Sequence, residues 1–153
     1  MNDIIIITGG ASGLGFELVK QSLEKGLVVC NIDKDTEKMS KLDNDFKGNY
    51  KGFCGDVSDE EFITNTISEI KNMGNIKVLI NNAGEPSFKI PTEYTKEDIE
   101  KCFKGLQGMI LASTQVLRVK EEKDVKIVNI MSSAALRGNK QESVYCATKW
   151  GER

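Results

Sequence analysis

Short apolar runs alternate with amphipathic segments along the chain, and this alternation constrains the fold more than any other feature. The first run, Ile4–Ile7, consists of four β-branched residues, which suits a strand buried on both faces of a sheet. A helical pattern follows over residues 13–25, with Leu14, Leu18 and Leu23 on one face. Strands that alternate with helices in this way indicate βαβ units and a parallel sheet.

The remaining segments follow the same two patterns. Ser58 and Glu61 have the spacing of a capping box, which predicts the start of a helix that Gly74 ends. The sequence predicts further strands over residues 27–32, 52–54, 77–80 and 125–130, and further helices over residues 35–46, 58–73, 95–119 and from 143 onward. It contains no evident linker, repeat or low-complexity segment, so residues 1–153 are predicted to form a single domain.

Five strands interleaved with helices predict an α/β fold of the Rossmann type, with a doubly wound parallel sheet. A complete fold of this kind has six strands arranged in two halves. We therefore expect a Rossmann domain whose C-terminal strands are missing. The strand over residues 125–130 would then lie at an uncovered edge of the sheet, where its apolar side chains favour self-association.

The composition argues against several classes of function. The net charge is -2 and no basic block occurs, whereas nucleic-acid binding requires a concentrated Lys and Arg surface. No apolar run approaches the ~20 residues of a membrane span. The start, MNDIIIITGG, lacks the basic n-region of a secretory signal. We therefore expect a cytoplasmic protein that binds neither nucleic acid nor membranes.

The chain has four cysteines and no histidine. No two cysteines form a Cys-x-x-Cys pair, so we expect no zinc site of the usual spacing and no other metal. Reduced thiols in a cytoplasmic protein are the simplest interpretation. Without histidine, Ser-His and Cys-His nucleophilic machinery is excluded, and acid–base chemistry near neutral pH requires other groups.

A glycine-rich turn, TGGASGLG at residues 8–15, joins the first strand to the first helix. Glycine permits positive φ and close approach of the backbone to a ligand. The helix N-terminus offers unpaired N–H groups to a pyrophosphate. Such a turn also occurs where it only packs a helix on a strand, but its place directly after a buried strand favours dinucleotide binding. The candidate cofactor-binding residues here are Gly9, Ser12, Gly13, Leu14 and Gly15.

Asp33 ends the second predicted strand, 20 residues after Gly13. An acid at this spacing accepts hydrogen bonds from the ribose hydroxyls of the adenosine, and its charge repels the 2′-phosphate of NADP. No Lys or Arg in residues 9–15 attracts that phosphate. These features favour NAD over NADP. Lys34, which adjoins Asp33, keeps NADP open, as does the alternative that Asp33 is a solvated acid in a charged run.

Further motifs follow in order along the chain: Asp56-Val57, Asn81-Asn82-Ala83-Gly84, the segment IVNIMSS at residues 127–133, and Tyr145-x-x-x-Lys149. Together with the glycine-rich turn, they resemble the classical branch of the short-chain dehydrogenase/reductase family, and within it the 3-oxoacyl-[acyl-carrier-protein] reductases. The motifs span residues 8–149, nearly the whole chain. Each motif is weak alone, but five in the family's order form a strong signal.

The resemblance implies where the cofactor, NAD or NADP, would lie. It places Asp56 and Val57 against the adenine. It places Asn82, Ala83 and Gly84 along the cofactor near its ribose. Residues 1–153 would thus form one NAD(P)-binding domain.

The resemblance also implies three catalytic residues. Ser132, 13 residues before Tyr145, would hydrogen-bond the carbonyl or hydroxyl of the substrate. Tyr145 would exchange the proton, while Lys149 would hold the nicotinamide ribose and lower the pKa of the tyrosine. Positions i and i+4 share one helix face, and a nearby ammonium favours the phenolate. Taken alone, such a pair is commonly a surface pair, and a serine after a strand is commonly a turn residue.

The sequence departs from the family pattern in two places. The family has an asparagine in the helix after the fourth strand, within Asn-Leu-x-Gly, and Gly105 stands at that position in Gly-Leu-Gln-Gly. The family's asparagine holds a water that relays protons to the lysine, which glycine cannot do. A shift of register onto Gln107 would break the Leu-x-Gly match. Family members also continue with further strands and a substrate-binding segment beyond the position of Arg153.

Two functions are consistent with these residues. The first is an NAD(P)-dependent oxidoreductase that transfers hydride between the nicotinamide and a small hydroxyl or carbonyl substrate. The second is a non-catalytic dinucleotide-binding module, or a degenerate remnant of such an enzyme. The resemblance leaves the substrate open among 3-oxoacyl thioesters, ketosteroids, sugar alcohols and simple ketones. It also implies a homo-oligomer, because the helix after the fourth strand and the tyrosine helix form the family's main dimer interface.

Overall fold

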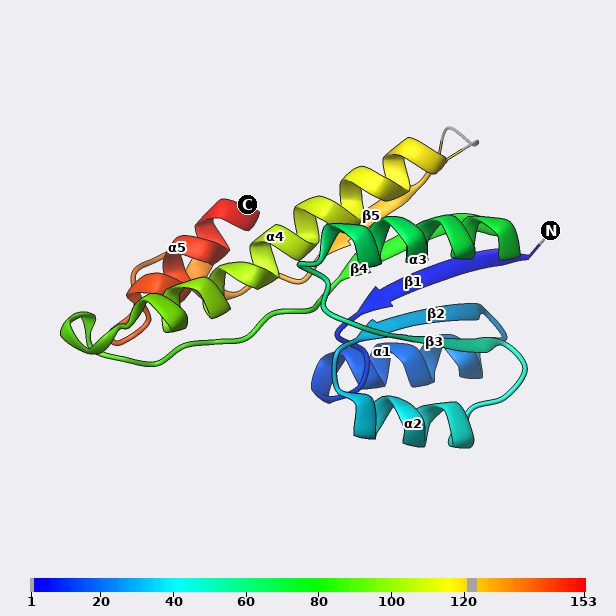
Figure 1. Ribbon diagram of the computed structural model, residues 1–153, viewed down its shortest axis with the longest axis horizontal. Helices are drawn as coiled ribbons and strands as arrows, with labels where there is room; N and C mark the ends of the chain where they lie inside the picture. The colour runs from blue at the N-terminus through cyan, green and yellow to red at the C-terminus, as the bar shows by residue number, and fades with distance from the viewer. Residues whose placement is uncertain (1, 121–123) are drawn as a thin grey trace.

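The computed structural model describes residues 2–120 and 124–153 (Figure 1). The strands are β1 (Asp3–Thr8), β2 (Val28–Asp33), β3 (Tyr50–Cys54), β4 (Asn75–Asn81) and β5 (Lys126–Asn129). The helices are α1 (Gly13–Glu24), α2 (Thr36–Asp45), α3 (Glu60–Met73), α4 (Lys96–Val119) and α5 (Ser143–Glu152), with 3-10 turns η1 (Pro91–Glu93) and η2 (Ser133–Ala135). The strands form one parallel sheet in the order β3-β2-β1-β4-β5. This order confirms the predicted Rossmann-type α/β fold.

Helices cover both faces of the sheet, with α3 and α4 on one side and α1 and α2 on the other (Figure 1). Because side chains alternate along a strand, β1 contributes to both layers. Its Ile4 and Ile6 belong to the cluster that includes Ile67 of α3, whereas Ile7 packs with Val19 of α1. Burying each of these side chains contributes about 1.5–3 kcal/mol. The run of isoleucines is therefore the central strand of the core.

The chain reverses direction across the sheet next to β1. After β1 it proceeds outward through β2 and β3, and it then returns to place β4 on the other side of β1. In open parallel sheets, ligands bind outside the carboxyl ends of the strands at such a switch point. The segments that follow β1, β2 and β4 therefore meet where a ligand is expected.

Leu14 does not lie on the buried face of its helix, contrary to the sequence prediction. The buried residues of α1 are Gly15 and Val19, and Leu14 is 56% exposed. Leu18 and Leu23 do pack against the core cluster of β1 and β2. Adjacent residues of an α-helix point about 100° apart around the helix axis. With Gly15 facing the sheet, Leu14 points away from it.

The cap of α3 also differs from the prediction. Asp59, not Ser58, is the N-cap, and its carboxylate accepts a hydrogen bond from the Phe62 N–H at 3.0 Å. The Ser58 hydroxyl instead donates to Asp56 Oδ1 at 2.7 Å. Both residue types are good caps. The Ser58 hydroxyl is bonded to Asp56, and Asp59 provides the cap.

Among the described residues, β5 pairs with β4 alone and forms one edge of the sheet. Val128 of β5 is 42% exposed, as expected for an uncovered edge strand. No helix in the described ranges is both long and apolar enough to cross a membrane.

Candidate active site

A cleft of about 370 Å³ lies at the carboxyl ends of the strands, within the size range of small-molecule sites. It brings together nine of the cofactor-binding residues predicted from the sequence: Gly9, Ser12, Leu14, Asp33, Asp56, Val57, Asn82, Ala83 and Gly84. Gly105 also lines it. In the described part of the chain, the lining does not include Gly13, Gly15, Ser132, Tyr145 or Lys149.

The glycine-rich turn requires glycine at two positions for different reasons. Gly15 packs so closely under the turn that a Cβ would lie 2.1 Å from the carbonyl oxygen of Gly9. Gly13 has a φ of +55°, and apart from its two chain neighbours and the nearby backbone of its own helix, no atom of the described residues lies within 4 Å of the place where its Cβ would be. Gly15 therefore fixes the turn, whereas Gly13 leaves its outer side open to a ligand.

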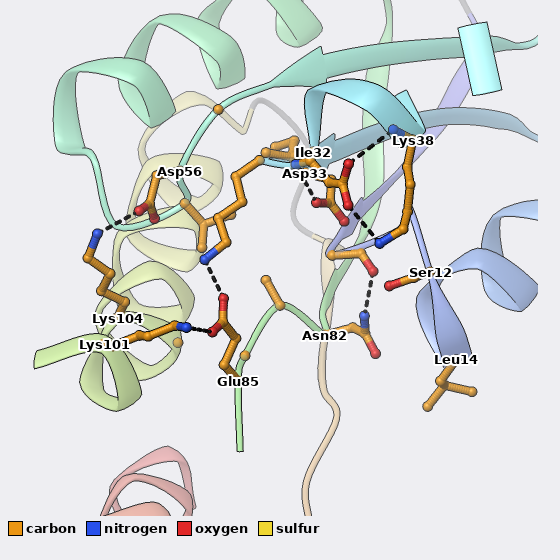
Figure 2. A pocket seen from close by; sticks show the side chains of 18 residues that line it. Ser12, Leu14, Ile32, Asp33, Lys38, Asp56, Asn82, Glu85, Lys101 and Lys104 are labelled. Carbon is orange, nitrogen blue, oxygen red and sulfur yellow. Dashed lines mark hydrogen bonds and ion pairs between the residues drawn. The ribbon is translucent and has the colours of Figure 1, made fainter. Parts of the chain in front are cut away.

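The start of α1 is arranged to receive an anion. Ser12 is the N-cap, and among the described residues its side chain makes no capping hydrogen bond, so its hydroxyl is available at the cleft. Leu14, which lies outside the buried face of α1, lines the cleft beside Ser12 (Figure 2). Unpaired N–H groups and the positive end of the helix dipole favour a phosphate at such a place.

Asn82 joins the end of β4 to the glycine-rich turn. Its side-chain amide donates to the carbonyl oxygens of Thr8 and Gly9 at 3.1 and 3.0 Å. The Thr8 hydroxyl accepts from the N–H groups of Asn82 and Ala83 at 3.0 and 3.1 Å. These bonds hold Ala83 and Gly84 at the edge of the cleft, so Asn82 and Thr8 are structural supports of its floor.

Asp33 is held by the backbone rather than free in solvent. Its Oδ2 accepts from the Ala11 N–H at 2.9 Å, and its Oδ1 accepts from the Asp35 N–H at 3.0 Å. Each carboxylate oxygen has more than one lone pair, so further donors can still be accepted at the cleft. The carboxylate thus presents fixed acceptors beside the glycine-rich turn.

Asp56 and Val57 connect the end of β3 to α4. Asp56 accepts from Lys104 Nζ at 2.8 Å and from the Ser58 N–H at 2.9 Å. Partial burial alone would raise the pKa of Asp56, but the bonds from Lys104 and Ser58 outweigh burial and lower the pKa to about 2. A Cβ at Gly108 would lie 2.4 Å from Val57 Cγ2, so Val57 packs directly against the α4 backbone.

Glu85, directly after the Asn-Asn-Ala-Gly motif, pairs with lysines from two sides of the cleft. It forms ion pairs with Lys34, next to Asp33, and with Lys101 of α4 at 2.9 Å (Figure 2). Burial opposes ionisation of Glu85, but its bonds to Lys34 and Lys101 dominate and lower its pKa. We name Glu85, Lys34 and Lys101 the clasp.

Ser132 is the N-cap of η2, and Tyr145 and Lys149 lie on α5, which packs against η2 and α4. Lys149 of α5 is buried, and its Nζ lies 5.7 Å from the centre of the Tyr145 ring. A Cβ on Gly84 would lie 3.7 Å from the same Nζ, so Lys149 adjoins the Gly84 end of the cleft. Ser132 caps η2, where its Oγ accepts from the Ala134 N–H at 3.2 Å.

Gly105, at the family's asparagine position, lies where α4 passes the Asn-Asn-Ala-Gly motif. A Cβ there would be 3.1 Å from Gly84 Cα and 4.0 Å from Glu152 Oε1 of α5. Gln107 does not substitute for an asparagine at this point, because its side chain donates to the Ser58 carbonyl at 3.1 Å. Gly105 therefore permits the close approach of α4, α5 and the loop after β4.

A glycine-rich turn after the first strand, facing an acid at the end of the second, is the arrangement typical of Rossmann-type dinucleotide-binding folds. The family model described as short chain dehydrogenase matches residues 3–153. The chain therefore belongs to the short-chain dehydrogenase family, whose members bind NAD(P).

Two relatives are about a quarter identical to this chain over the aligned residues. The 3-oxoacyl-[acyl-carrier-protein] reductase of Mus musculus is 27% identical, over 99% of this chain and 65% of that protein. The L-fucose dehydrogenase of Bos taurus is 28% identical, over 95% of this chain and 55% of that protein. This chain thus spans less than two thirds of the length of either relative.

Solved structures show the same fold. A short-chain dehydrogenase/reductase from Vibrio parahaemolyticus superposes with a TM-score of 0.88 at 27% identity, over 97% of this chain and 64% of that one. A short-chain dehydrogenase from Streptomyces avermitilis gives a TM-score of 0.90 at 24% identity, over 99% of this chain and 57% of that one.

The sequence prediction missed three groups of residues at the site. Thr8 was seen only as the start of the turn, although its position at the end of a buried strand could have marked it as a support. The clasp joins residues far apart in sequence, and no spacing rule reveals it. Glu152, three residues after Lys149, has the spacing of a helical ion pair, and this signal was available.

Proposed function

We propose that the protein is an NAD(P)-dependent oxidoreductase that transfers hydride between the nicotinamide and a small hydroxyl or carbonyl substrate. The observation that carries the proposal is the Tyr145–Lys149 pair on α5, with the Lys149 ammonium beside the Gly84 end of the glycine-lined cleft. A dinucleotide-binding cleft alone would support only binding. The adjoining phenol and ammonium add a means of moving a proton.

The residues of the cleft fit the cofactor. Gly13 leaves open space at positive φ, and Ser12 offers its hydroxyl at the N-terminus of α1. Asp33 presents fixed acceptors to ribose hydroxyls, and Gly84 provides a flat edge without a side chain. When bound, the cofactor supplies the hydride acceptor or donor. Lys149 would hold its nicotinamide ribose.

The protein's own groups would handle the proton. For oxidation of an alcohol, the Tyr145 phenolate accepts the hydroxyl proton while Ser132 donates a hydrogen bond to the developing carbonyl oxygen. The Lys149 ammonium, 5.7 Å from the centre of the tyrosine ring, would offset negative charge on the tyrosine during the transfer. In the reverse direction the phenol returns its proton to the oxygen.

We further propose that NAD is preferred over NADP. The carboxylate of Asp33 stands at the cleft, and the lysines that follow it are already paired with acids. Lys34 pairs with Glu85, and Lys38 pairs with Asp35 at 2.6 Å. A 2′-phosphate beside Asp33 would face the negative charge of the carboxylate, and the two lysines that follow Asp33 would have to leave their acidic partners to neutralise it.

A second candidate function is a dinucleotide-binding module without turnover. One observation favours it: the cleft lining in the described ranges excludes Ser132 and Tyr145, and Lys149 is already bound to a carboxylate. The sequence departure at Gly105 points the same way.

One experiment separates the two candidates. NADH binding is measured by fluorescence titration, and turnover is measured with a panel of 3-oxoacyl thioesters, ketosteroids, simple ketones and sugar alcohols. We expect the parent to bind NADH and to turn over at least one substrate class, and Tyr145→Phe to bind NADH without turnover. Binding without turnover by the parent would support the module. Absence of both NADH and NADPH binding would contradict both candidates.

The remaining properties are also proposals. Residues 1–153 would act as a single domain, because both helix layers pack on one sheet. Four free thiols support a cytoplasmic location.

A homo-oligomer is supported by an exposed apolar stripe on α4, where Phe103, Ile110 and Leu117 recur every seven residues. Light scattering on the parent and on Ile110→Lys tests the oligomer, which the substitution should dissociate.

A further inference from the structure

Lys149 has a buried acidic partner that the proposed chemistry does not use. Glu152, one turn further along α5, places Oε2 2.7 Å from Lys149 Nζ. The two residues are 7% and 9% exposed. The same Nζ also lies 3.5 Å from the carbonyl oxygen of Ile130, after β5. The ammonium is therefore fixed from two directions.

An ammonium in this position requires a counter-charge. Removing one partner of a buried ion pair leaves an unsolvated charge, which is strongly unfavourable. The titratable group that α4 contributes here is Cys102. Burial raises the pKa of its thiol, so Cys102 stays neutral near pH 7. Glu85, the acid on the loop after β4, is committed to Lys34 and Lys101. Glu152 is thus the acid that balances Lys149.

Gly105 of α4 lies beside this carboxylate and close to the loop after β4. A Cβ at Gly105 would stand 4.0 Å from Glu152 Oε1 and 3.1 Å from Gly84 Cα. Any larger side chain on α4 would reach the carboxylate and press on the loop that borders the cleft. A glycine on α4 and an acid on α5 therefore form one complementary arrangement around the ammonium.

We propose that Glu152 is a positioning residue, which holds the Lys149 ammonium at the Gly84 end of the cleft so that Lys149 can bind the nicotinamide ribose. In this chain the carboxylate of Glu152, which lies beside Gly105 of α4, holds the Lys149 ammonium by a buried ion pair. The inference rests on the proposed function for its cofactor, but the Lys149–Glu152 contact itself does not.

The first test measures NADH affinity by fluorescence titration in the 153-residue chain. We expect Glu152→Ala to weaken binding by about tenfold, equivalent to about 1.4 kcal/mol. Glu152→Asp, which keeps the charge on a shorter side chain, should recover part of the loss. Formate should also restore binding to Glu152→Ala, and chloride at equal ionic strength should not. Glu142→Ala is the matched control, because this glutamate at the opposite, N-terminal end of α5 accepts a hydrogen bond from the Asn139 side chain instead.

Two results of the first test would overturn the proposal. One is that folded Glu152→Ala binds NADH as tightly as the parent. The other is that Glu152→Ala lowers thermal stability but leaves NADH affinity unchanged, because a merely structural ion pair would behave in this way.

A second test needs no cofactor and covers the case in which Glu152→Ala does not fold. Thermal midpoints are measured for Lys149→Met, Glu152→Leu and the double variant. We expect each single substitution to lower the midpoint more than the double one, because only the single variants strand a buried charge. Additive shifts would overturn the inference. If the parent binds no NADH, the proposed function fails, and this cycle alone decides whether Glu152 holds Lys149.

Discussion

At the scale of single residues, the cleft depends on what Gly13 lacks. Its φ of +55° and the open space beside it leave the backbone of the turn accessible. We expect Gly13→Val to weaken NADH binding by at least about tenfold, because a β-branched side chain at positive φ costs about 1–2 kcal/mol and covers the N–H groups. Fluorescence titration measures this.

Ser132→Ala serves as the control for Gly13→Val, since Ser132 caps η2 and its proposed contact is with the reacting oxygen of the substrate rather than with the cofactor. It should bind NADH like the parent. If both variants bind like the parent, the glycine-rich turn only packs α1 on the sheet.

Asp33 offers a second test at this scale. Asp33→Asn removes the negative charge and keeps an acceptor for the Ala11 N–H that Asp33 now binds at 2.9 Å. We expect the preference for NADH over NADPH to narrow by about tenfold, because the charge that repels the 2′-phosphate is lost. Parallel titrations of the two reduced cofactors measure the ratio. An unchanged ratio would mean that Asp33 does not select the cofactor.

The sequence predicts the residues of the site better than the contacts they make. Nine predicted residues meet in one cleft because motifs at strand ends converge in a parallel sheet. Leu14 was placed on the wrong face because Gly15 and Val19, not the larger leucine, make the closest packing. Glu152 was overlooked because its role depends on Gly105 of another helix.

At the scale of elements, Asp59 determines where α3 begins. Its carboxylate caps the Phe62 N–H, whereas Ser58 binds Asp56. Loss of a capping side chain typically costs about 1 kcal/mol, so we expect Asp59→Ala to lower the free energy of unfolding by about that amount. Urea unfolding followed by circular dichroism measures it. Ser58→Ala should have less effect, and a larger effect of Ser58→Ala would restore the capping box predicted from sequence.

The ion pair of Asp56 with Lys104 links the end of β3 to α4. The pKa of Asp56 is lowered from 3.8 to about 2 in the folded protein. Its stabilisation is therefore complete above the unfolded pKa and is lost as the pH falls through the folded value. The lysine side chain is 49% exposed, so after solvent screening the contribution is about 1 kcal/mol.

Lys104→Met tests this link. It should raise the pKa of Asp56 toward its ordinary value and lower the free energy of unfolding by about 1 kcal/mol near pH 6. The difference from the parent should shrink between pH 4 and pH 2, where Asp56 becomes protonated. Urea unfolding at several pH values provides the measurement. A difference that stays constant down to pH 2 would show that packing of the lysine stem, not the ion pair, is responsible.

At the scale of the whole molecule, the order of elements was predictable because short apolar runs alternate with segments of helical period 3.6 in this sequence. The strand Ile4–Ile7 and the helix over residues 95–119 were both recognised, and the parallel sheet followed from their alternation. The helix ends and the ion pairs across the cleft were not predictable, since they depend on side chains brought together only by folding. The clasp is the clearest example, as its members span 67 positions, from Lys34 to Lys101.

The cleft that includes the clasp is electrically balanced. Its lining holds four carboxylates, on Asp33, Asp35, Asp56 and Glu85, and four ammonium groups, on Lys34, Lys38, Lys101 and Lys104. Because the side-chain charges of the lining sum to zero, we expect them to add little attraction for an approaching anionic dinucleotide. The cofactor must instead be captured by fit after it arrives.

Cofactor binding without electrostatic attraction can be recognised from the salt dependence of the association rate constant. In stopped-flow experiments, the association rate constant of NADH should change by less than about twofold between ~0.05 and ~0.5 M NaCl, because screening has little to remove. Glu85→Gln removes the acidic partner of both Lys34 and Lys101 and gives the lining a net charge of +1, so we expect NADH to associate faster with this variant at low salt and this advantage to decline as salt rises. A steep salt dependence in the parent would contradict the balance. A cleft without net side-chain charge would therefore bind its cofactor more slowly than a positively charged cleft, but at a rate that depends little on ionic strength.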